Sequence, residues 1–245
     1  MSAPLCIGVD FGGTKIEGII LADARKNPTV VARRRIPTEA DSGYSHLLER
    51  TAAFIEGLLA EAGAGATVGI GMPGSVTREG LVKNSNTVCL NGTPFRADLA
   101  RRLGRDPAFA NDANCFALAE ATLGAGRGHR LVFGAILGTG VGGGLVFDGE
   151  VREGPQSICG EWGHAILFPE SARRCYCGQN GCTETYLAGP WIERHYRELG
   201  GADGVRLQEI LARDASLDAA ASACIAVWLD AFGRALANLI NVLDP

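Results

Sequence analysis

Three cysteines, Cys175, Cys177 and Cys182, crowd into a short stretch of a chain that has 245 residues and eight cysteines. A tight cysteine cluster without a secretory signal is more typical of a metal site than of a disulfide framework. The remaining cysteines are scattered singly, most of them in apolar surroundings that suit small core residues. The sequence therefore predicts a metal-binding loop around residues 175–182.

Two glycine-rich segments could hold phosphate groups. The first, Asp10 to Lys15, follows a short apolar run, and the second, Gly138 to Gly144, stands between two apolar runs. Glycines let backbone N–H groups approach a phosphate closely, a threonine hydroxyl and a lysine add a donor and a charge, and an aspartate holds Mg2+ through water. Either segment alone reads equally well as a tight turn between strands, but the pair favours a nucleotide gripped from two sides. The residues expected to contact it are Asp10, Gly12, Gly13, Thr14, Lys15, Gly138, Thr139, Gly140 and Gly142.

Two glycine patterns match a dinucleotide fingerprint only in their letters. Gly138-x-Gly140-x-x-Gly143 is followed by the apolar run 145–147, and Gly69-x-Gly71-x-x-Gly74 by another strand-like segment. The fingerprint requires a helix at that point. An NAD site is therefore excluded, and a Walker loop is excluded because Thr14 stands where that loop needs lysine.

The apolar pattern predicts an α/β protein with two lobes. Strands are expected at 6–10, 16–21, 30–36, 68–72, 107–110, 131–137 and 144–147, and helices at 44–62, 95–103, 113–123 and 219–243. Gly63 and Gly104 are expected to end the first two helices, and residues 155–189 are expected to be irregular. A strand-turn-strand unit occurs in each half, which favours lobes at 1–117 and 118–245 around a cleft.

Composition narrows the class of protein. The chain is 47% hydrophobic and 20% charged, with a formal net charge of -4, so nothing suggests a nucleic-acid partner. Its apolar strand-like runs are far shorter than a membrane span, and its first residues lack the pattern of a signal peptide. We expect a cytoplasmic protein with no membrane partner.

Five motifs occur in the order seen in the ROK family, which comprises repressors, uncharacterised reading frames and sugar kinases. They are Asp10 to Lys15, Asn111 to Asn114, Gly138 to Gly144, Glu161 to His164, and Cys175-x-Cys177-Gly178-x-x-Gly181-Cys182-x-Glu184. The chain resembles this family from about Leu5 to Pro245. Residues 82–86 and 90–92 look most like bacterial ROK fructokinases with mannokinase activity, and other stretches resemble N-acetylglucosamine kinases.

The resemblance implies a two-lobed actin/hexokinase-like (ribonuclease H-like) ATPase fold and an ATP- and Mg2+-dependent transfer of phosphate to a hexose. It makes Asp112 the general base, although an aspartate at this position would also suit a helix cap. The implied sugar contacts are Gly74, Asn86, Asn111, Asp112, Glu161, His164 and Glu184, with a solvated surface charge as the alternative for Glu161. His164 joins Cys175, Cys177 and Cys182 in a closed, structural Zn2+ set. The resemblance also implies a homodimer, and we rank fructose first, then mannose, glucose and N-acetylglucosamine.

The closing helix raises a difficulty for the nucleotide site. In ROK kinases this helix is followed by a strand, a third glycine-rich loop near the adenosine and a terminal helix, whereas this sequence stops at Pro245. We therefore expect either a truncated C-terminal lobe or a lobe whose missing parts are supplied by pairing with another copy of the chain. Two alternatives stay open: a ROK repressor, which would carry a DNA-binding region ahead of Asp10, and a non-catalytic sugar-binding module.

Overall fold

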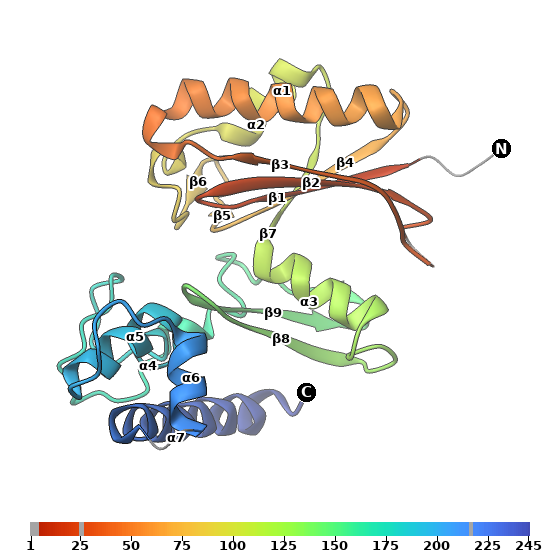
Figure 1. Cartoon of the computed structure of the whole chain (residues 1–245). Helices are drawn as coiled ribbons and strands as arrows, with labels where there is room; N and C mark the ends of the chain where they lie inside the picture. The colour runs from red at the N-terminus through yellow and green to blue at the C-terminus, as the bar shows by residue number, and fades with distance from the viewer. Residues whose placement is uncertain (1–4, 25–26, 216–217) are drawn as a thin grey trace. The chain divides into compact units, whose positions relative to one another are not determined.

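The computed structural model describes residues 5–24, 27–215 and 218–245, and the chain divides into two compact units (Figure 1). The first unit comprises the residues up to Cys115 together with Gly154–Ile158, and the second comprises Phe116–Glu153 and Cys159–Pro245. The division falls inside helix α3 (Asp112–Leu123), the same helix in which the boundary at residue 117 was expected. The return of residues 154–158 to the first unit was not indicated by the sequence.

The first unit is built on a five-stranded sheet in the order β3-β2-β1-β4-β7. Its strands are β1 (Cys6–Phe11), β2 (Lys15–Ala22), β3 (Thr29–Pro37), β4 (Thr67–Met72) and β7 (Ala108–Asn111). Strands β1, β2 and β3 pair antiparallel, whereas β4 and β7 run parallel to β1. Because parallel strands end at the same edge of a sheet, the residues after β1, β4 and β7 are brought to one edge.

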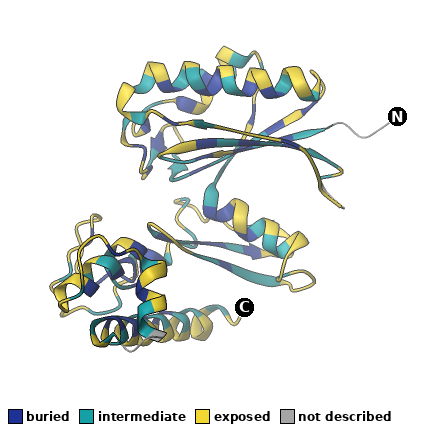
Figure 2. Cartoon of the chain, viewed as in Figure 1, coloured by how far each residue is buried: buried dark blue, intermediate teal, exposed yellow. Residues whose placement is uncertain are grey.

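Helices α1 (Tyr44–Ala62) and α2 (Phe95–Leu103) cover one face of this sheet (Figure 1). The sheet-facing side of α1 carries its buried residues, as Figure 2 shows in dark blue: Leu47, Thr51, Ala52, Ile55 and Leu58. The helix crosses β2 so closely at Gly18 that a Cβ there would lie 2.4 Å from the Leu58 side chain. The glycine therefore sets the distance between helix and sheet.

Short elements complete the first unit between the larger ones. They are the 3-10 turns η1 (Ala40–Ser42) and η2 (Val88–Leu90) and the two-stranded pair β5 (Ser75–Val76) and β6 (Val82–Lys83). The β5–β6 pair directly follows the end of β4, which places it beside the edge of the sheet where the candidate site lies.

The second unit pairs a three-stranded sheet with a group of helices. Its strands are β8 (Leu131–Leu137), β9 (Val141–Phe147) and β10 (Glu150–Val151), in the order β10-β9-β8. Helix α3 packs on β8 where Gly134 meets Ala117, since a Cβ on Gly134 would lie 2.7 Å from that alanine. The remaining elements are η3 (Trp162–His164), α4 (Glu184–Leu187), α5 (Gly189–Glu198), α6 (Leu207–Ala215) and α7 (Ala219–Leu243).

Helix α7 is the longest element of the described chain. Asp218 caps it by accepting a hydrogen bond from the Ala221 backbone at 3.0 Å, and its buried residues, among them Cys224 and Ala231, belong to clusters shared with α4, α5 and α6. By length and composition alone this helix is long and apolar enough to cross a membrane, and 22% of its most apolar stretch is buried. Core helices pass the same test, so this finding is weak evidence for a membrane span.

The structure confirms the expected strands and helices with small shifts at their ends. Helices α1, α2 and α7 begin and end where the sequence predicts, with Gly63 and Gly104 as C-caps at positive φ. The expected loop at 138–143 is shorter than predicted, because β9 already begins at Val141. Helices α5 and α6 were not predicted, and α4 lies inside the stretch expected to be irregular.

Candidate functional site

The first glycine segment forms the turn between β1 and β2. The Gly12 N–H donates to the Lys15 carbonyl at 2.9 Å, which closes the turn. Thr38, at the end of β3, fixes it from the side: its N–H donates to the Thr14 carbonyl at 3.0 Å and its hydroxyl to the Gly12 carbonyl at 2.6 Å. Gly13 lies beside Asn86, since a Cβ there would be 3.4 Å from the Asn86 amide oxygen. The turn is thus held rigidly at the sheet edge.

Charged side chains flank this turn on both strands. Lys15 opens β2, and its Nζ lies 3.7 Å from a carboxylate oxygen of Glu17, with 45% of the Lys15 side chain exposed. Asp10 stands near the end of β1, is exposed, and pairs across the sheet with Gly71 of β4. A phosphate would therefore meet a partly exposed lysine, while an Mg2+ ion would find the Asp10 carboxylate open to solvent.

Asp112 is the first residue of α3 and directly follows β7. Its Oδ1 accepts a hydrogen bond from the Ala113 N–H at 2.8 Å. Burial, together with the negative charge of Asp10, raises the pKa of the Asp112 carboxyl above its ordinary value. A carboxylate whose proton affinity is raised in this way is suited to accept a proton from a hydroxyl group.

The helix-cap role, which was the alternative to a general base for Asp112, belongs to the neighbouring Asn111. The Asn111 side-chain oxygen accepts from the Asn114 N–H at 3.1 Å, three residues further on, which is the geometry of an N-cap. The Asn111 amide nitrogen donates to the Gly74 carbonyl at 3.0 Å. Asp112 therefore does not act as the N-cap of α3. Any contact of Asn111 with a sugar must use the second N–H of its amide or the second lone pair of its amide oxygen.

Gly74 and Asn86 lie on either side of the β5–β6 pair. Gly74 has φ 86°, and a Cβ there would lie 2.4 Å from the Lys83 carbonyl oxygen, so only glycine fits. Asn86 is exposed, and the neighbouring Ser85 is fixed by two hydrogen bonds to Asn91, at 2.9 Å each. The first unit thus gathers one set of predicted site residues: Asp10, Gly12, Gly13, Thr14, Lys15, Gly74, Asn86, Asn111 and Asp112.

The second glycine segment is the turn between β8 and β9. Strand pairing runs to Leu137 and Val141, so the turn itself is Gly138-Thr139-Gly140, while Gly142 lies within β9. The Gly138 N–H donates to the Gly140 carbonyl at 2.9 Å, and the Gly189 N–H at the start of α5 donates to the Gly138 carbonyl at 2.8 Å. This turn has the same strand-turn-strand form as the one in the first unit.

Glu184 ties the second glycine turn to the cysteine-rich segment. Its side chain is buried, and its Oε2 accepts a hydrogen bond from the Val141 N–H at 3.0 Å. A Cβ on Gly140 would lie 3.0 Å from the same oxygen. The predicted sugar contact at Glu184 would therefore use the other carboxylate oxygen. No local sequence pattern indicates this link between Glu184 and the glycine turn.

Glu161 and His164 are brought together by the 3-10 turn η3. The His164 N–H donates to the Glu161 carbonyl at 3.2 Å, as their spacing predicts. The indole of Trp162 donates to the Gly142 carbonyl at 2.7 Å, and Gly163 lies so close to β9 that a Cβ would be 2.0 Å from the Val141 carbonyl oxygen. The turn is thus clamped to the strand that follows the glycine turn.

The predicted metal ligands converge in space. The donor atoms of His164, Cys175, Cys177 and Cys182 all lie within 4.8 Å of one another. The Cys175 Sγ is 3.6 Å from the His164 Nδ1, and the Cys177 Sγ is 3.6 Å from the Cys182 Sγ. One imidazole and three thiols at these separations suit a tetrahedral Zn2+ with no ligand position left for water. The donor set and its geometry therefore fit a structural zinc ion.

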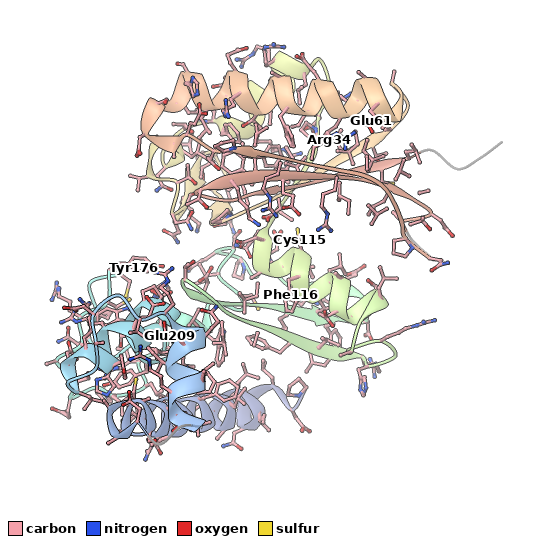
Figure 3. The ribbon with its side chains drawn as sticks, in the orientation of Figure 1. Arg34, Glu61, Cys115, Phe116, Tyr176 and Glu209 are labelled. Carbon is pink, nitrogen blue, oxygen red and sulfur yellow. The ribbon has the colours of Figure 1, made fainter. Side chains whose placement is uncertain are left out.

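Tyr176 was not predicted as a site residue, although it stands between two of the metal ligands. Its hydroxyl is 2.9 Å from the His164 Nε2, and the two rings meet edge-on with centroids 5.1 Å apart. The side chain is 81% exposed and projects from the cysteine-rich segment, where Figure 3 labels it. Tyr176 thus occupies the imidazole nitrogen that faces away from the metal ligands, the one a sugar would need.

Comparisons with known proteins agree with this geometry. The sequence profile of the ROK family matches residues 6–245. An N-acetyl-D-glucosamine kinase of Escherichia coli O7:K1 is 38% identical over 253 residues, which cover 97% of this chain and 80% of that protein. The ROK hexokinase of Thermus thermophilus superposes with a TM-score of 0.83 at 31% identity, over 98% of this chain and 79% of that one. A ROK glucokinase of Streptomyces griseus, solved with glucose and AMPPNP, gives a TM-score of 0.77 at 27% identity over 98% and 80%.

The fold, with its strand-turn-strand unit in each half, is the actin/hexokinase-like α/β fold of sugar kinases. The chain belongs to the ROK family, as a sugar kinase that acts on hexoses. Fructose, ranked first from the sequence, is not specifically supported, since the matching curated relatives of Escherichia coli and Salmonella are N-acetyl-D-glucosamine kinases.

Proposed function

We propose that the protein transfers the γ-phosphate of ATP to a hydroxyl group of N-acetyl-D-glucosamine. The observation that carries the chemistry is Asp112, a half-buried carboxylate beside the Asp10 charge, at the sheet edge that also bears the first glycine turn. The support for the substrate is the identity of 38% with kinases of this sugar. Glucose, mannose and fructose are the competing substrates within the family.

The reaction divides among residues with distinct duties. Asp112 takes the proton from the sugar hydroxyl as the oxygen attacks the γ-phosphorus, and ADP leaves with the electrons of the broken P–O bond. The N–H groups of the turns at 12–14 and 138–140 and the charge of Lys15 are assigned to the phosphates, and Asp10 would hold Mg2+, which neutralises them. The proposed sugar contacts are Gly74, Asn86, Asn111, Glu161, His164 and Glu184.

We assign a structural role to zinc. The metal would bind the His164 Nδ1 and three thiolates, which fixes the imidazole so that its Nε2 is presented to the sugar. Loss of the metal would release the segment that also carries Glu184, and through Glu184 the turn at Gly140. Zinc would thus order two groups of proposed site residues without taking part in the chemistry.

The substrate assignment is tested by kcat/KM for the four hexoses with Mg-ATP, measured as sugar-dependent release of ADP. We expect N-acetylglucosamine to give the highest value. An N-acetyl pocket that hydrogen-bonds its amide discriminates strongly against sugars lacking that group, so a margin well above tenfold is expected. A higher kcat/KM for fructose would overturn the substrate assignment and leave the kinase class intact.

We also propose a cytoplasmic homodimer without nucleic-acid or membrane partners, on the strength of the family resemblance and the net charge of -4. Gel filtration coupled to light scattering measures the molar mass of the protein in solution and so tests for the dimer. A mass of one chain, 25.6 kDa, would refute it.

A further inference from the structure

A cavity of about 500 Å³ lies in the second unit, and none of its lining residues is assigned to the kinase chemistry. One wall is the segment that leads into the metal cluster, with Arg173 and Arg174, and the other is a face of helix α5. The α5 residues that line it are Trp191, Arg194, His195 and Glu198. A volume of this size admits a small metabolite.

The cavity carries more positive than negative charge. Arg194 pairs with Glu198 at 2.8 Å, but within the described residues neither Arg173 nor Arg174 has a carboxylate within 4.0 Å. Arg173 is nevertheless held in place, because it donates to the Thr185 carbonyl at 3.0 Å and stacks on a tyrosine ring 4.2 Å away. The lining therefore contains one ion pair, Arg194 with Glu198, and two guanidinium groups, those of Arg173 and Arg174, whose charge is not compensated by a described carboxylate.

His195 adds an unsatisfied polar group to the same wall. Only 18% of its side chain is exposed, its ring nitrogens are buried, and neither makes a hydrogen bond to another described residue. The nearest carboxylate oxygen, on Glu198, is 3.6 Å from Nδ1, which is too far for a hydrogen bond. Burial and the charge of Arg173 lower the pKa of His195, so the ring offers one N–H donor at neutral pH. A buried donor left unpaired is costly, and a bound ligand or water would satisfy it.

We propose that this cavity binds the phosphate group of a small phosphate monoester through Arg173, Arg174 and His195. A monoester carries close to two negative charges near neutral pH, which match the two unpaired guanidinium groups. The planar arginine fork fits two phosphate oxygens at once, and Trp191, with the Arg194 guanidinium 5.2 Å from its ring centroid, belongs to the same lining. The product of the proposed kinase reaction, a hexose 6-phosphate, belongs to this class of ligand.

The test reads the cavity directly through Trp191. The chain has three tryptophans, so three indole N–H signals appear in a 15N–1H spectrum, and Trp191→Phe identifies the one from the cavity. The protein is titrated with N-acetylglucosamine 6-phosphate, with inorganic phosphate and with the unphosphorylated sugar. We expect the Trp191 signal to shift with both phosphate compounds, and an equal affinity for inorganic phosphate would identify the free anion as the ligand. A shift of equal size with the unphosphorylated sugar would overturn the proposal.

Arginine variants decide whether the cavity is responsible. Arg174→Gln should weaken binding of the monoester by about tenfold or more, the loss expected for one hydrogen-bonded charge. Arg127→Gln is the matched control, because Arg127 is an exposed arginine of the same unit, outside the cavity lining and without an ion pair to a described residue. His195→Phe, on helix α5, repeats the test by removing the third proposed ligand, whose ring nitrogens make no hydrogen bond to another described residue.

An unchanged Kd in both Arg174→Gln and His195→Phe, or no shift of the Trp191 signal up to millimolar ligand, would overturn the site. The experiment measures binding and needs no turnover. Failure of the proposed kinase reaction would therefore leave the result untouched, and the two proposals fail separately.

Discussion

Replacing Gly74 by alanine probes the junction between the β5–β6 pair and the candidate base. Gly74 has φ 86°, and an alanine Cβ would lie 2.4 Å from the Lys83 carbonyl oxygen and 2.7 Å from the Ser85 nitrogen. Both are backbone atoms, so no side-chain rotation relieves the contact. The substitution must displace the segment 83–85 or the end of β4.

The cost has two parts that can be separated. A left-handed conformation costs a non-glycine residue about 1–2 kcal/mol, and overpacking against fixed atoms costs about 1–3 kcal/mol more. Gly74→Ala should therefore lower the free energy of unfolding by about 2–5 kcal/mol. Gly80→Ala is the matched control, because Gly80 has φ 84° and nothing within 4 Å of its would-be Cβ, so it should lose only the first part.

Urea unfolding at 25 °C measures both variants, with the midpoint and slope giving the free energy. The Gly74 carbonyl also holds the Asn111 amide, next to Asp112, so Gly74→Ala should weaken sugar binding as well, whereas Gly80→Ala should not. Equal losses of stability in the two variants, within about 0.5 kcal/mol, would show that the close contact is not real and that the site is built differently.

Three further substitutions test separate parts of the site. Asp112→Asn should raise the urea midpoint at pH 7. Burial raises the pKa of Asp112 in the folded state above its ordinary 3.8. The wild type therefore loses stability as the pH rises through the folded-state pKa and Asp112 ionises, whereas asparagine does not ionise. That advantage should shrink towards pH 4, and a pH-independent difference would contradict it. Cys177→Ser should abolish stoichiometric zinc and weaken sugar binding, with Cys159→Ser as control, and metal analysis showing full zinc in the first variant would count against the site. Tyr176→Phe should lower KM for the sugar, because it frees the His164 Nε2 to contact the sugar. The expected change is about fivefold, the value of one hydrogen bond, with kcat and the zinc content unchanged. A higher KM would mean that Tyr176 orients the imidazole for the sugar.

Local signals explain which parts of the fold the sequence predicts. Gly63 and Gly104 end their helices because the chain needs a positive φ there, and this requirement is visible in the residue type alone. The four metal ligands are likewise recognisable from their donor atoms and spacing. Helices α5 and α6 were not predicted from the sequence, because each buries only a few apolar side chains, such as Ile192 and Ile210, among many charged residues.

The remaining features of the fold and of the site depend on contacts between segments that are distant in the sequence, and local residue patterns do not predict such contacts. Glu184 reaches Val141 across 43 positions, and β9 begins early although glycines disfavour a strand. Gly143 is required there by packing, since a Cβ would lie 2.4 Å from the Phe133 ring. In the same way, the division of labour between Asn111 as helix cap and Asp112 as candidate base depends on the three-dimensional turn at the end of β7.

The most direct test of the account compares wild type and Asp112→Asn with N-acetylglucosamine and Mg-ATP, measuring ADP release and, by calorimetry, sugar binding. Asparagine keeps the shape and the oxygen that accepts from Ala113 but cannot take a proton. We predict turnover in the wild type, a fall in kcat of about 10²–10⁴-fold in the variant, and sugar binding within a few-fold in both. Undiminished turnover in Asp112→Asn, or sugar binding without any turnover in the wild type, would contradict the account.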